Sequence, residues 1–512
     1  MSTSGRIVKN AGFLYAKMGI TMFVSLYTTR LILNSLGASD FGVFNIVGGA
    51  IAMLGFLNAA MASATQRFMS YAEGEGNKDN KKIIFNISII LNTIIAFIVL
   101  ILLLIASYFF FNGLLRIDDD RMFAAKVVYG CLIVSTMLTV VNVPYDAVMN
   151  SHENMLYYSV IGIIESVLKL IVAFACVYTT FDKLIVYGVL TACIPAITLS
   201  IMKVYCHHHY EECVIAPKRY YNSQTLAEMI HFAGWNFLST FTALISGHGS
   251  NLVLNHYFGT TLNAANGVTG QLNGQLQVFG NTLLKALNPV IVKKEGGHER
   301  NIMFKFAFTG AKMTVCLYAF FAIPFIIDRD YILQLWLVNV PNFTSEFVQL
   351  GVIWVFCDQI GGTLGTVVNA VGRIREINII HSSLMLFNIF LIGWAFHLGF
   401  PPQTMLIISS IISLGKLSAT LFYCKKYARM SILLYMNNVF ARSLLVITLV
   451  YCATYVVWNN LEMGLHRFIL VCLFSSTIYT IMFYNVCLVG EERSKIRNMI
   501  LNLYQRLLKS RK

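Results

Sequence analysis

The chain has 512 residues, of which 57% are hydrophobic and only 12% are charged. Ordinary soluble domains carry roughly 25% charged residues, so this composition excludes most soluble enzymes. The net charge of +14 is spread over short loops. Binding to nucleic acid would instead require a soluble basic domain, which the sequence does not contain. The composition therefore predicts an integral membrane protein.

Long apolar segments follow one another from the N-terminus almost to the end of the chain. Each approaches the roughly 20 residues that a helix needs to cross a bilayer. The first segment lacks the short apolar core and cleavage site of a secretory signal, so we expect it to be retained as a helix. We predict an all-α protein with about fourteen transmembrane helices, at residues 11–36, 40–69, 83–111, 122–149, 156–178, 184–205, 225–257, 262–290, 304–327, 347–370, 377–397, 403–424, 439–459 and 467–487.

Basic residues are concentrated in every second loop. The loops that contain Lys78 and Lys293, together with the C-terminal tail, hold about four times as many basic residues as the opposite loops, which contain Arg121 and Lys183. Because basic loops stay in the cytoplasm, both termini are predicted to be cytoplasmic. The tail after residue 490 alternates apolar and basic residues, a pattern typical of an amphipathic helix on a membrane surface.

Two parts of the sequence share one pattern. Residues 31–34 end in Asn34 and precede Gly37 and Asn45, while residues 252–255 end in Asn255 and precede Gly259 and Asn266, so the two asparagine pairs are equally spaced. Transporters often consist of such repeats with the substrate site between them. The pattern predicts two six-helix lobes related by a pseudo-two-fold axis, two extra helices and a cytoplasmic basic tail, at residues 1–221, 222–430, 431–487 and 488–512.

Several basic side chains fall inside the apolar segments, where a charge costs about 2.5–3.5 kcal/mol and usually marks a cavity or a pathway. Six of them are our candidates for a cationic cavity: Lys17, Arg30, Lys169, Lys285, Lys312 and Lys416. Arg30 lies near a segment end, from which it can also extend to the interface. Lys169 follows Glu165 by four residues, so a structural ion pair is an equal alternative there. A basic interior favours an anionic passenger such as a diphosphate.

The seventh and eighth segments are rich in amides that cannot all face lipid. They must bond across helices or line water. With the first segments, they supply six candidates for a polar cavity lining: Asn34, Asn45, Asn255, Asn266, Gln271 and Gln275. No catalytic triad, Walker motif or paired-histidine metal motif is present, and we expect the histidines after Cys206 to be a solvated turn. The sequence therefore predicts a transporter, with no catalytic residues, metal or cofactor.

Three segments carry a family resemblance. Residues 30–42 follow the pattern R-x-L-x-x-x-L-G-x-x-x-[FY]-G, with Ile32 in place of the first leucine. Residues 62–68 close the second span, and Pro144-Tyr145-Asp146-Ala147 precedes His152-Glu153. With these motifs and its topology, the chain resembles the Wzx-type O-antigen and capsule flippases. Their superfamily also contains the multidrug and toxin extruders and the lipid II flippase.

The resemblance implies a flippase of the bacterial inner membrane that moves undecaprenyl-diphosphate-linked sugar units outward by alternating access, with a polysaccharide polymerase and a chain-length regulator as further partners. It implies Lys17 and Arg30 as cationic cavity positions, with Lys285 less surely so. The seventh span offers Glu228 and His231 where related transporters often have an aspartate, so sodium and proton both stay open as coupling ions. The alternatives are an ion-coupled multidrug extruder and a lipid II flippase. A glycosyltransferase would need a larger loop than the longest here, about 19 residues.

Overall fold

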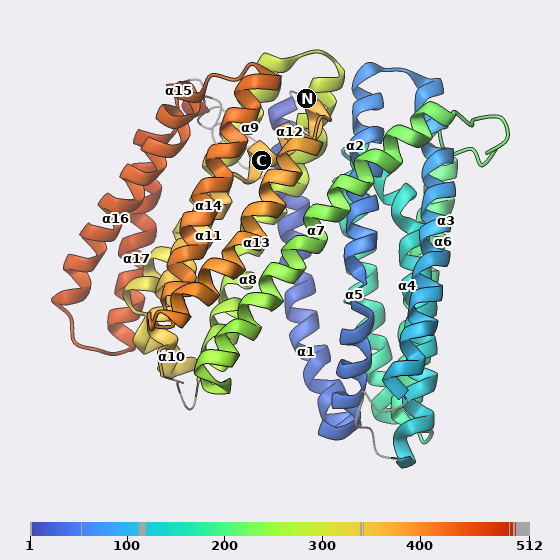
Figure 1. Cartoon of the computed structure of the whole chain (residues 1–512), viewed down its shortest axis with the longest axis horizontal. Helices are drawn as coiled ribbons and strands as arrows, with labels where there is room; N and C mark the ends of the chain where they lie inside the picture. The colour runs from blue at the N-terminus through green and yellow to red at the C-terminus, as the bar shows by residue number, and fades with distance from the viewer. Residues whose placement is uncertain are drawn as a thin grey trace, which may run out of the picture. The chain divides into compact units, whose positions relative to one another are not determined.

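The computed structural model describes residues 3–52, 54–111, 119–337, 340, 342–490, 492–494 and 497. Within these ranges the regular structure is helical throughout, which confirms the predicted all-α membrane class. In chain order (Figure 1), the α-helices are α1 (Thr3–Ala52), α2 (Gly55–Glu75), α3 (Lys78–Phe109), α4 (Met122–Ser151), α5 (Met155–Tyr178), α6 (Lys183–His209), α7 (Ser223–Phe258), α8 (Thr260–Gly296), α9 (Arg300–Ile327), α10 (Arg329–Trp336), α11 (Thr344–Ile360), α12 (Gly362–Val371), α13 (Arg375–His397), α14 (Thr404–Tyr423), α15 (Ile432–Tyr435), α16 (Arg442–Asn459) and α17 (Leu465–Met482).

Short π-helical segments extend several of these helices. Among them are Cys424–Ala428 after α14, Met436–Ala441 after α15 and Phe483–Cys487 after α17, and a 3-10 turn, Asp119–Arg121, precedes α4. Ten helical segments of the described chain are long and apolar enough to cross a membrane. The helices α1, α2, α7 and α8 are not among the ten, although each has more than twenty residues. These four helices carry many of the lysine, arginine and amide side chains of the first, second, seventh and eighth predicted spans, which explains their lower hydropathy.

Two predicted spans contain an interruption. The segment predicted at 40–69 is divided between the end of α1 and the start of α2, whereas the kink of α1 at Gly37, where φ is 78°, lies between the predicted spans 11–36 and 40–69. The segment predicted at 347–370 is one candidate membrane span, Thr344–Val371, which is interrupted at Gly361 between α11 and α12. Hydropathy does not register the interruption at Gly361, because glycine interrupts a helix without making it polar.

The backbone repeats the pattern that the sequence suggested. Gly37 and Gly259 both have φ of 78°, the value that ends one helical segment and starts the next in each half of the chain. At the same separation, Gly76 and His298 adopt φ of 72° and 59° just before α3 and α9. Only glycine adopts this left-handed region without steric cost. The duplication is therefore present in the placement of helix ends, beyond the residues that first indicated it.

The described chain forms two compact units. The first contains residues 1–244, 285–303 and 367–382, and the second contains residues 245–284, 304–366 and 383–512. The helices α7, α8, α9, α12 and α13 therefore contribute to both units. The predicted lobe boundaries at 221 and 430 stay predictions. Of the predicted tail, residues 491, 495, 496 and 498–512 lie outside the described residues.

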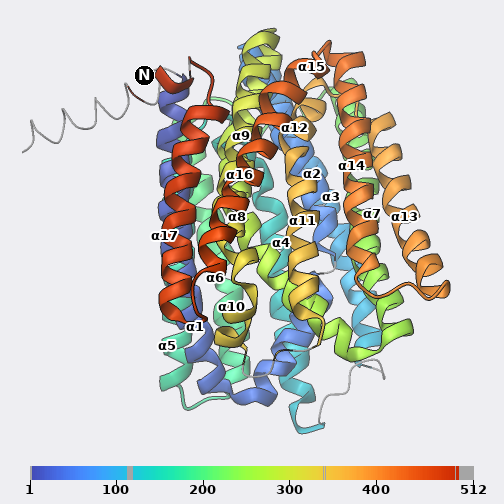
Figure 2. The same ribbon diagram turned by 90° about the vertical axis from the view of Figure 1, so that its left-hand side faces the viewer.

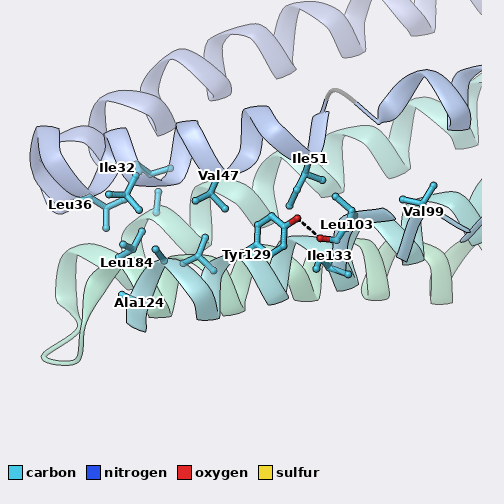
Figure 3. Close-up of a cluster of buried hydrophobic side chains, with 14 residues drawn as sticks. Ile32, Leu36, Val47, Ile51, Val99, Leu103, Ala124, Tyr129, Ile133 and Leu184 are labelled. Atoms are coloured by element: carbon cyan, nitrogen blue, oxygen red, sulfur yellow. Dashed lines mark hydrogen bonds between the residues drawn. The ribbon is translucent and has the colours of Figure 1, made fainter. Parts of the chain in front are cut away.

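An apolar core holds the first unit together (Figure 3). Val47 and Ile51 of α1 pack with Val99 and Leu103 of α3 and with residues of α4, and all of these are buried. Tyr129 of α4 lies within this cluster and donates its hydroxyl hydrogen to the carbonyl of Leu103 at 2.7 Å. That bond satisfies a polar group that would otherwise be stranded among apolar side chains. The core thereby fixes α1, α3 and α4 relative to one another.

Charged groups join the loops at each end of the first unit. At one end, Arg121 before α4 binds Asp40 of α1 through both carboxylate oxygens and Asp182 before α6 at 2.7 Å. At the other end, Glu73 of α2 accepts hydrogen bonds from Lys81 of α3 at 2.7 Å and from Lys293 of α8 at 3.2 Å. Alternate loops thus meet at opposite ends, as the distribution of basic residues predicted.

The Glu73 end continues into the loop after α6. His152 bonds Glu212 at 2.5 Å and stacks on Tyr210 with ring centroids 4.3 Å apart. Burial would raise the pKa of Glu73, but the hydrogen bond from Lys81 and the charges of His152 and Lys293 outweigh it and lower that pKa below its usual value. The carboxylate is therefore charged at neutral pH and holds α2, α3 and α8 together.

The ends of α2 and α8 approach each other more closely than any side chain would allow. A Cβ on Gly74 would lie 2.1 Å from the carbonyl oxygen of Lys293, and a Cβ on Gly296 would lie 2.2 Å from that of Tyr71. Backbone atoms of one helix therefore fill the space that a methyl group on the other would need. This reciprocal contact depends on glycine at both positions.

We predict that Gly74→Ala and Gly296→Ala each destabilise the protein, because α2 and α8 must separate to admit the methyl group. Overpacking of this kind costs about 1–3 kcal/mol. Thermal unfolding in detergent measures it, with Gly234→Ala of α7 as the control because nothing lies within 4 Å of the added Cβ there. A melting temperature unchanged in both variants would contradict the close contact.

In the second unit, the last two long helices pack against α9. Helices α16 and α17 lie side by side (Figure 2), and Val446, Val450 and Val471 are fully buried against Ala319 and Ile323 of α9. Ion pairs fix the hairpin at both ends. Arg467 of α17 binds Asp328 at the end of α9 at 2.5 Å, and Lys312 within α9 binds Glu492 after α17.

We predict that Arg467→Met strongly destabilises the second unit. Asp328 is 1% exposed, and removing its partner leaves an uncompensated buried charge, which costs about 3–5 kcal/mol. The double variant Arg467→Met/Asp328→Leu should recover most of this loss because no charge remains. Thermal unfolding separates the two, and Lys169→Gln, which removes one partner of a half-exposed pair, should have almost no effect. Equal loss in the single and double variants would mean that packing, rather than charge, holds the hairpin.

Candidate functional site

Two of the predicted lysines converge on one aromatic ring of the first unit. Lys17 of α1 places its Nζ 4.5 Å from the ring centroid of Tyr158 in α5, and Lys285 of α8 places its Nζ 4.0 Å from the same centroid. Lys285 also donates a hydrogen bond to the Tyr158 hydroxyl. A ring face attracts cations through its quadrupole, so Tyr158 holds both ammonium groups in place.

A cavity of about 170 Å³ opens beside this cluster. Lys17 and Tyr158 line it together with Asn142 and Asp146 of α4 and Glu165 of α5, and α6 supplies apolar wall residues. Asn142 lies 3.4 Å from the Asp146 carboxylate, to which it can donate a hydrogen bond. The site is therefore polar on the side of α1, α4 and α5.

The charges around the cavity do not cancel. Glu165 is neutralised by Lys169, whose Nζ lies 2.7 Å from it on the outer side of α5. Over the described part of the chain, neither Lys17 nor Lys285 has a carboxylate oxygen within 4.0 Å. Two ammonium groups thus face one remaining carboxylate, that of Asp146. Buried charges are normally paired, and this imbalance leaves positive charge for an anionic ligand.

A glycine makes room for Lys17. A Cβ on Gly162 of α5 would lie 2.0 Å from Cε and 2.3 Å from Nζ of Lys17. The lysine side chain therefore lies directly against the backbone of α5, one turn from Tyr158. Because the crowded atoms belong to the flexible end of a side chain, a methyl group here would displace the ammonium group without separating the helices.

We predict that Gly162→Ala abolishes most transport while the protein still inserts and folds. The added methyl removes Lys17 from Tyr158, and alanine in a helix is itself slightly stabilising relative to glycine. Transport at matched protein levels and thermal unfolding provide the two measurements. The control is Gly130→Ala in α4, where nothing lies within 4 Å of the new Cβ. Normal transport by Gly162→Ala would show that the position of Lys17 is unimportant.

The remaining cationic candidates lie in other surroundings. Lys312 is 1% exposed and is paired with Glu492, and Lys416 of α14 lies 2.7 Å from Asp358 of α11, so carboxylates compensate both charges. Arg30 is exposed on α1. Lys169 belongs to the ion pair with Glu165 that was one of its two expected roles. The structure therefore brings together only Lys17 and Lys285 among the described side chains of these six.

The amide candidates are dispersed. Asn266 of α8 donates to Asn251 of α7 at 2.6 Å, so this pair bonds the two helices within the second unit. Asn255 accepts a backbone bond from Gly259 through its carbonyl at 2.8 Å, immediately before the break between α7 and α8. Asn34, Gln271 and Gln275 are exposed. The side chain of Asn45 lies outside the described residues.

Sequence reasoning assigned no role in the cavity to three residues of the site. Tyr158 and Gly162 are ordinary residues of an apolar segment, and Asp146 entered only through the motif Pro144-Tyr145-Asp146-Ala147. Their role comes from α1 and α8, which are distant in the sequence and lie against α5. The sequence alone could not have identified Tyr158 as the partner of the two lysines, because only the folded chain shows which aromatic ring lies beside them.

A known family pattern covers part of the first half of the chain. Residues 16–175 match the MatE family model. No curated protein matches the sequence at a significant level. The matched segment contains Lys17, Asp146, Tyr158 and Gly162, which are four of the residues around the cavity.

Solved structures resemble the fold over most of its length. A multidrug-resistance MATE transporter of the MOP superfamily in an outward-facing conformation has a TM-score of 0.69 at 14% identity, covering 83% of this chain and 96% of that one. The Vibrio cholerae MATE transporter VcmN in its bent form has a TM-score of 0.67 at 17% identity, covering 83% and 98%.

A third structure is described by the polarity of its pocket. It is a MOP superfamily transporter from Pyrococcus furiosus whose reversed pocket polarity suggests a different function, with a TM-score of 0.67 at 14% identity, covering 83% and 96%. These likenesses show that the chain has the fold of the MATE transporters. With ten described helical segments long and apolar enough to cross a bilayer, it is a multi-pass membrane protein.

Proposed function

We propose that this chain is a flippase. It moves undecaprenyl-diphosphate-linked oligosaccharide units across the bacterial inner membrane by alternating access, with both termini in the cytoplasm, and supplies O-antigen, capsule or exopolysaccharide synthesis. The observation that carries the proposal is the pair of ammonium groups, Lys17 and Lys285, that share Tyr158 without a carboxylate partner among the described residues. A polysaccharide polymerase and a chain-length regulator are the proposed partners.

A diphosphate needs positive charge wherever it crosses an apolar region. Lysine binds phosphate as a point charge, without the bidentate geometry of arginine, so it can follow a moving headgroup through changing contacts. Two lysines on different helices can also release the ligand in turn as the helices move. The reversed pocket polarity of the Pyrococcus furiosus transporter supports the idea that this fold accepts passengers of different charge.

Two alternatives within the same fold stay open. An ion-coupled multidrug extruder is favoured by the multidrug-resistance transporters among the similar structures and by Asp146 and Glu165 on the cavity wall. A lipid II flippase would handle the same diphosphate chemistry with a peptidoglycan precursor. The three functions predict different accumulated substrates, so one set of measurements separates them.

We predict that charge at position 17 controls glycan export. Lys17→Arg should retain much of the activity, Lys17→Ala should lose most of it, and Lys17→Glu should be worse because it repels the diphosphate. Lys285→Ala should behave like Lys17→Ala. Export of the polysaccharide is compared at matched protein levels, with Lys126→Ala as the control because Lys126 is an exposed lysine of α4 beside the Phe111 ring.

Depletion of the protein then identifies the passenger. Accumulation of undecaprenyl-linked repeat units on the inner face is the expected result, whereas accumulation of lipid II indicates the peptidoglycan alternative. Sensitivity to organic cations without accumulation of any lipid-linked glycan would favour the extruder. Wild-type export by both Lys17→Ala and Lys17→Glu would remove the proposed role of the two lysines.

A further inference from the structure

A second cavity of the first unit has a chemistry that the proposed transport site does not use. It has a volume of about 450 Å³ and lies between α2, α7 and the connection from α12 to α13. Arg67, Arg373 and Arg375 supply positive charge, while Phe232 and Trp235 form apolar walls. Glu228 and Glu376 also line it, and both are exposed. Three guanidinium groups thus face two carboxylates.

The central group of this cavity is Arg67. Its Nε donates to the carbonyl of Asn369 at 3.1 Å, and its Nη2 donates to that of Ala370 at 3.2 Å. Its guanidinium carbon lies 4.6 Å from the ring centroid of Phe68 and 5.4 Å from that of Phe232. The plane of the guanidinium group is therefore fixed by two carbonyls and two aromatic rings.

Arg67 forms no ion pair in the part of the chain that the structure describes, and the carboxylate of Glu228, which lines the same cavity, acts on it only from a longer distance. No carboxylate oxygen there lies within 4.0 Å of its nitrogens, and its hydrogen bonds to the two carbonyls use Nε and Nη2 rather than Nη1. A half-buried guanidinium without a carboxylate is unusual, since buried charges are normally paired. The group is positioned as a donor for an anion that enters the cavity.

The opposite wall is equally well fixed. Trp235 donates its indole hydrogen toward His231 at 3.0 Å, and its backbone carbonyl accepts a bond from Asn378 at 3.0 Å. The guanidinium of Arg375 lies 5.4 Å from the Trp235 ring. A ligand between Arg67 and Arg375 would therefore meet positive charge beside an aromatic surface.

The backbone leaves space for Arg67 at one glycine. Gly372, between α12 and α13, has φ of 84°, and a Cβ there would lie 2.4 Å from Nη2 of Arg67. Glycine is thus required both for the turn and for the approach of the guanidinium. This connection belongs to the basic set of loops, and Arg67 lies about 12 Å along α2 from its last residue.

We propose that this cavity binds the phosphate headgroup of a lipid at the cytoplasmic face. Basic pockets between transmembrane helices on that side are typical sites for phosphate headgroups, and guanidinium groups match phosphate oxygens in bidentate geometry. The ligand is a phosphate ester or diphosphate ester whose chain lies in the inner leaflet. The identification of this ligand as the transported diphosphate lipid rests on the proposed function. The inference that the cavity binds a phosphate group is independent of that function.

The fluorescence of Trp235 reports binding at this cavity and not at Lys17. The purified full-length chain in detergent is titrated with undecaprenyl diphosphate, with phosphatidylglycerol and with inorganic pyrophosphate. The signal is the part of the emission change that Trp235→Phe removes. We expect saturable binding of at least one of the two lipids, weakened about tenfold or more in Arg67→Gln, as is typical for loss of a charged hydrogen bond.

Two further variants keep the test decisive if Arg67→Gln folds poorly. Arg375→Gln should weaken binding several-fold without affecting folding, because Arg375 is exposed and its guanidinium lies against the Trp235 ring. Arg219→Gln removes an exposed positive charge in the loop between α6 and α7, beside Tyr220, and should bind as the wild type does. Wild-type affinity of Arg67→Gln and Arg375→Gln for both lipids would overturn the proposal.

The two lipids distinguish the source of the headgroup. Preference for undecaprenyl diphosphate, with competition by pyrophosphate, identifies a loading site for the transported lipid. Equal or better binding of phosphatidylglycerol identifies a membrane-lipid site with the same phosphate chemistry. If Arg67→Gln loses lipid binding but glycan export continues, the site stands apart from transport. In another outcome, the Lys17 variants lose glycan export while Arg67→Gln and Arg375→Gln bind lipid as the wild type does. That result would support the proposed function and overturn the proposed lipid site.

Discussion

Compensation of charge in an apolar environment is the constraint on which the arrangement of this protein depends. A charge removed from water is tolerated only where an opposite charge, a ring face or several polar atoms replace its hydration. Lys312 and Lys416 meet carboxylates, and Arg121 joins Asp40 and Asp182 at one end of the first unit. These pairs determine which helices stay together. Lys17, Lys285 and Arg67 are compensated by rings and carbonyls instead, which hold the cation in place and leave its charge uncancelled.

The same distinction explains how far the sequence predicted the site. Each buried lysine was visible as a charge in an apolar segment, so Lys17 and Lys285 were found together with four cations that serve other purposes. The interaction partner of each cation distinguishes the site lysines from the other candidates. Glu492 and Asp358, the partners of Lys312 and Lys416, lie far from these lysines in the sequence. Tyr158 had no signal at all, because an aromatic residue in an apolar helix is ordinary. Arg67 and Gly372 belong to different segments, and only the folded chain brings them into contact.

The fold itself was easier to predict. Backbone groups in lipid must bond within the segment, so a long apolar run can only be a helix there. Alternation of basic loops predicted which helix ends meet, and the contacts of Arg121 and Glu73 at opposite ends of the first unit agree with it. The break between α1 and α2 and the interruption at Gly361 were missed, because hydropathy averages over a window and a local change of backbone conformation leaves the average unchanged. The kink at Gly37 falls between two predicted spans, and the left-handed glycines at 37 and 259 repeat this feature in both halves of the chain.

The last hairpin shows how pairing and packing together constrain motion. Helices α16 and α17 fall outside the duplication and correspond to the two extra helices that the sequence predicted. In the second unit they are fixed to α9 by buried valines and by ion pairs toward both ends. A helix held near one end can pivot, but one held near both ends moves with its partner. The buried Asp328 also receives the indole hydrogen of Trp458 at 3.1 Å, so the far end is held by two residues of the hairpin. Any motion of α9 within the second unit must therefore carry α16 and α17 with it.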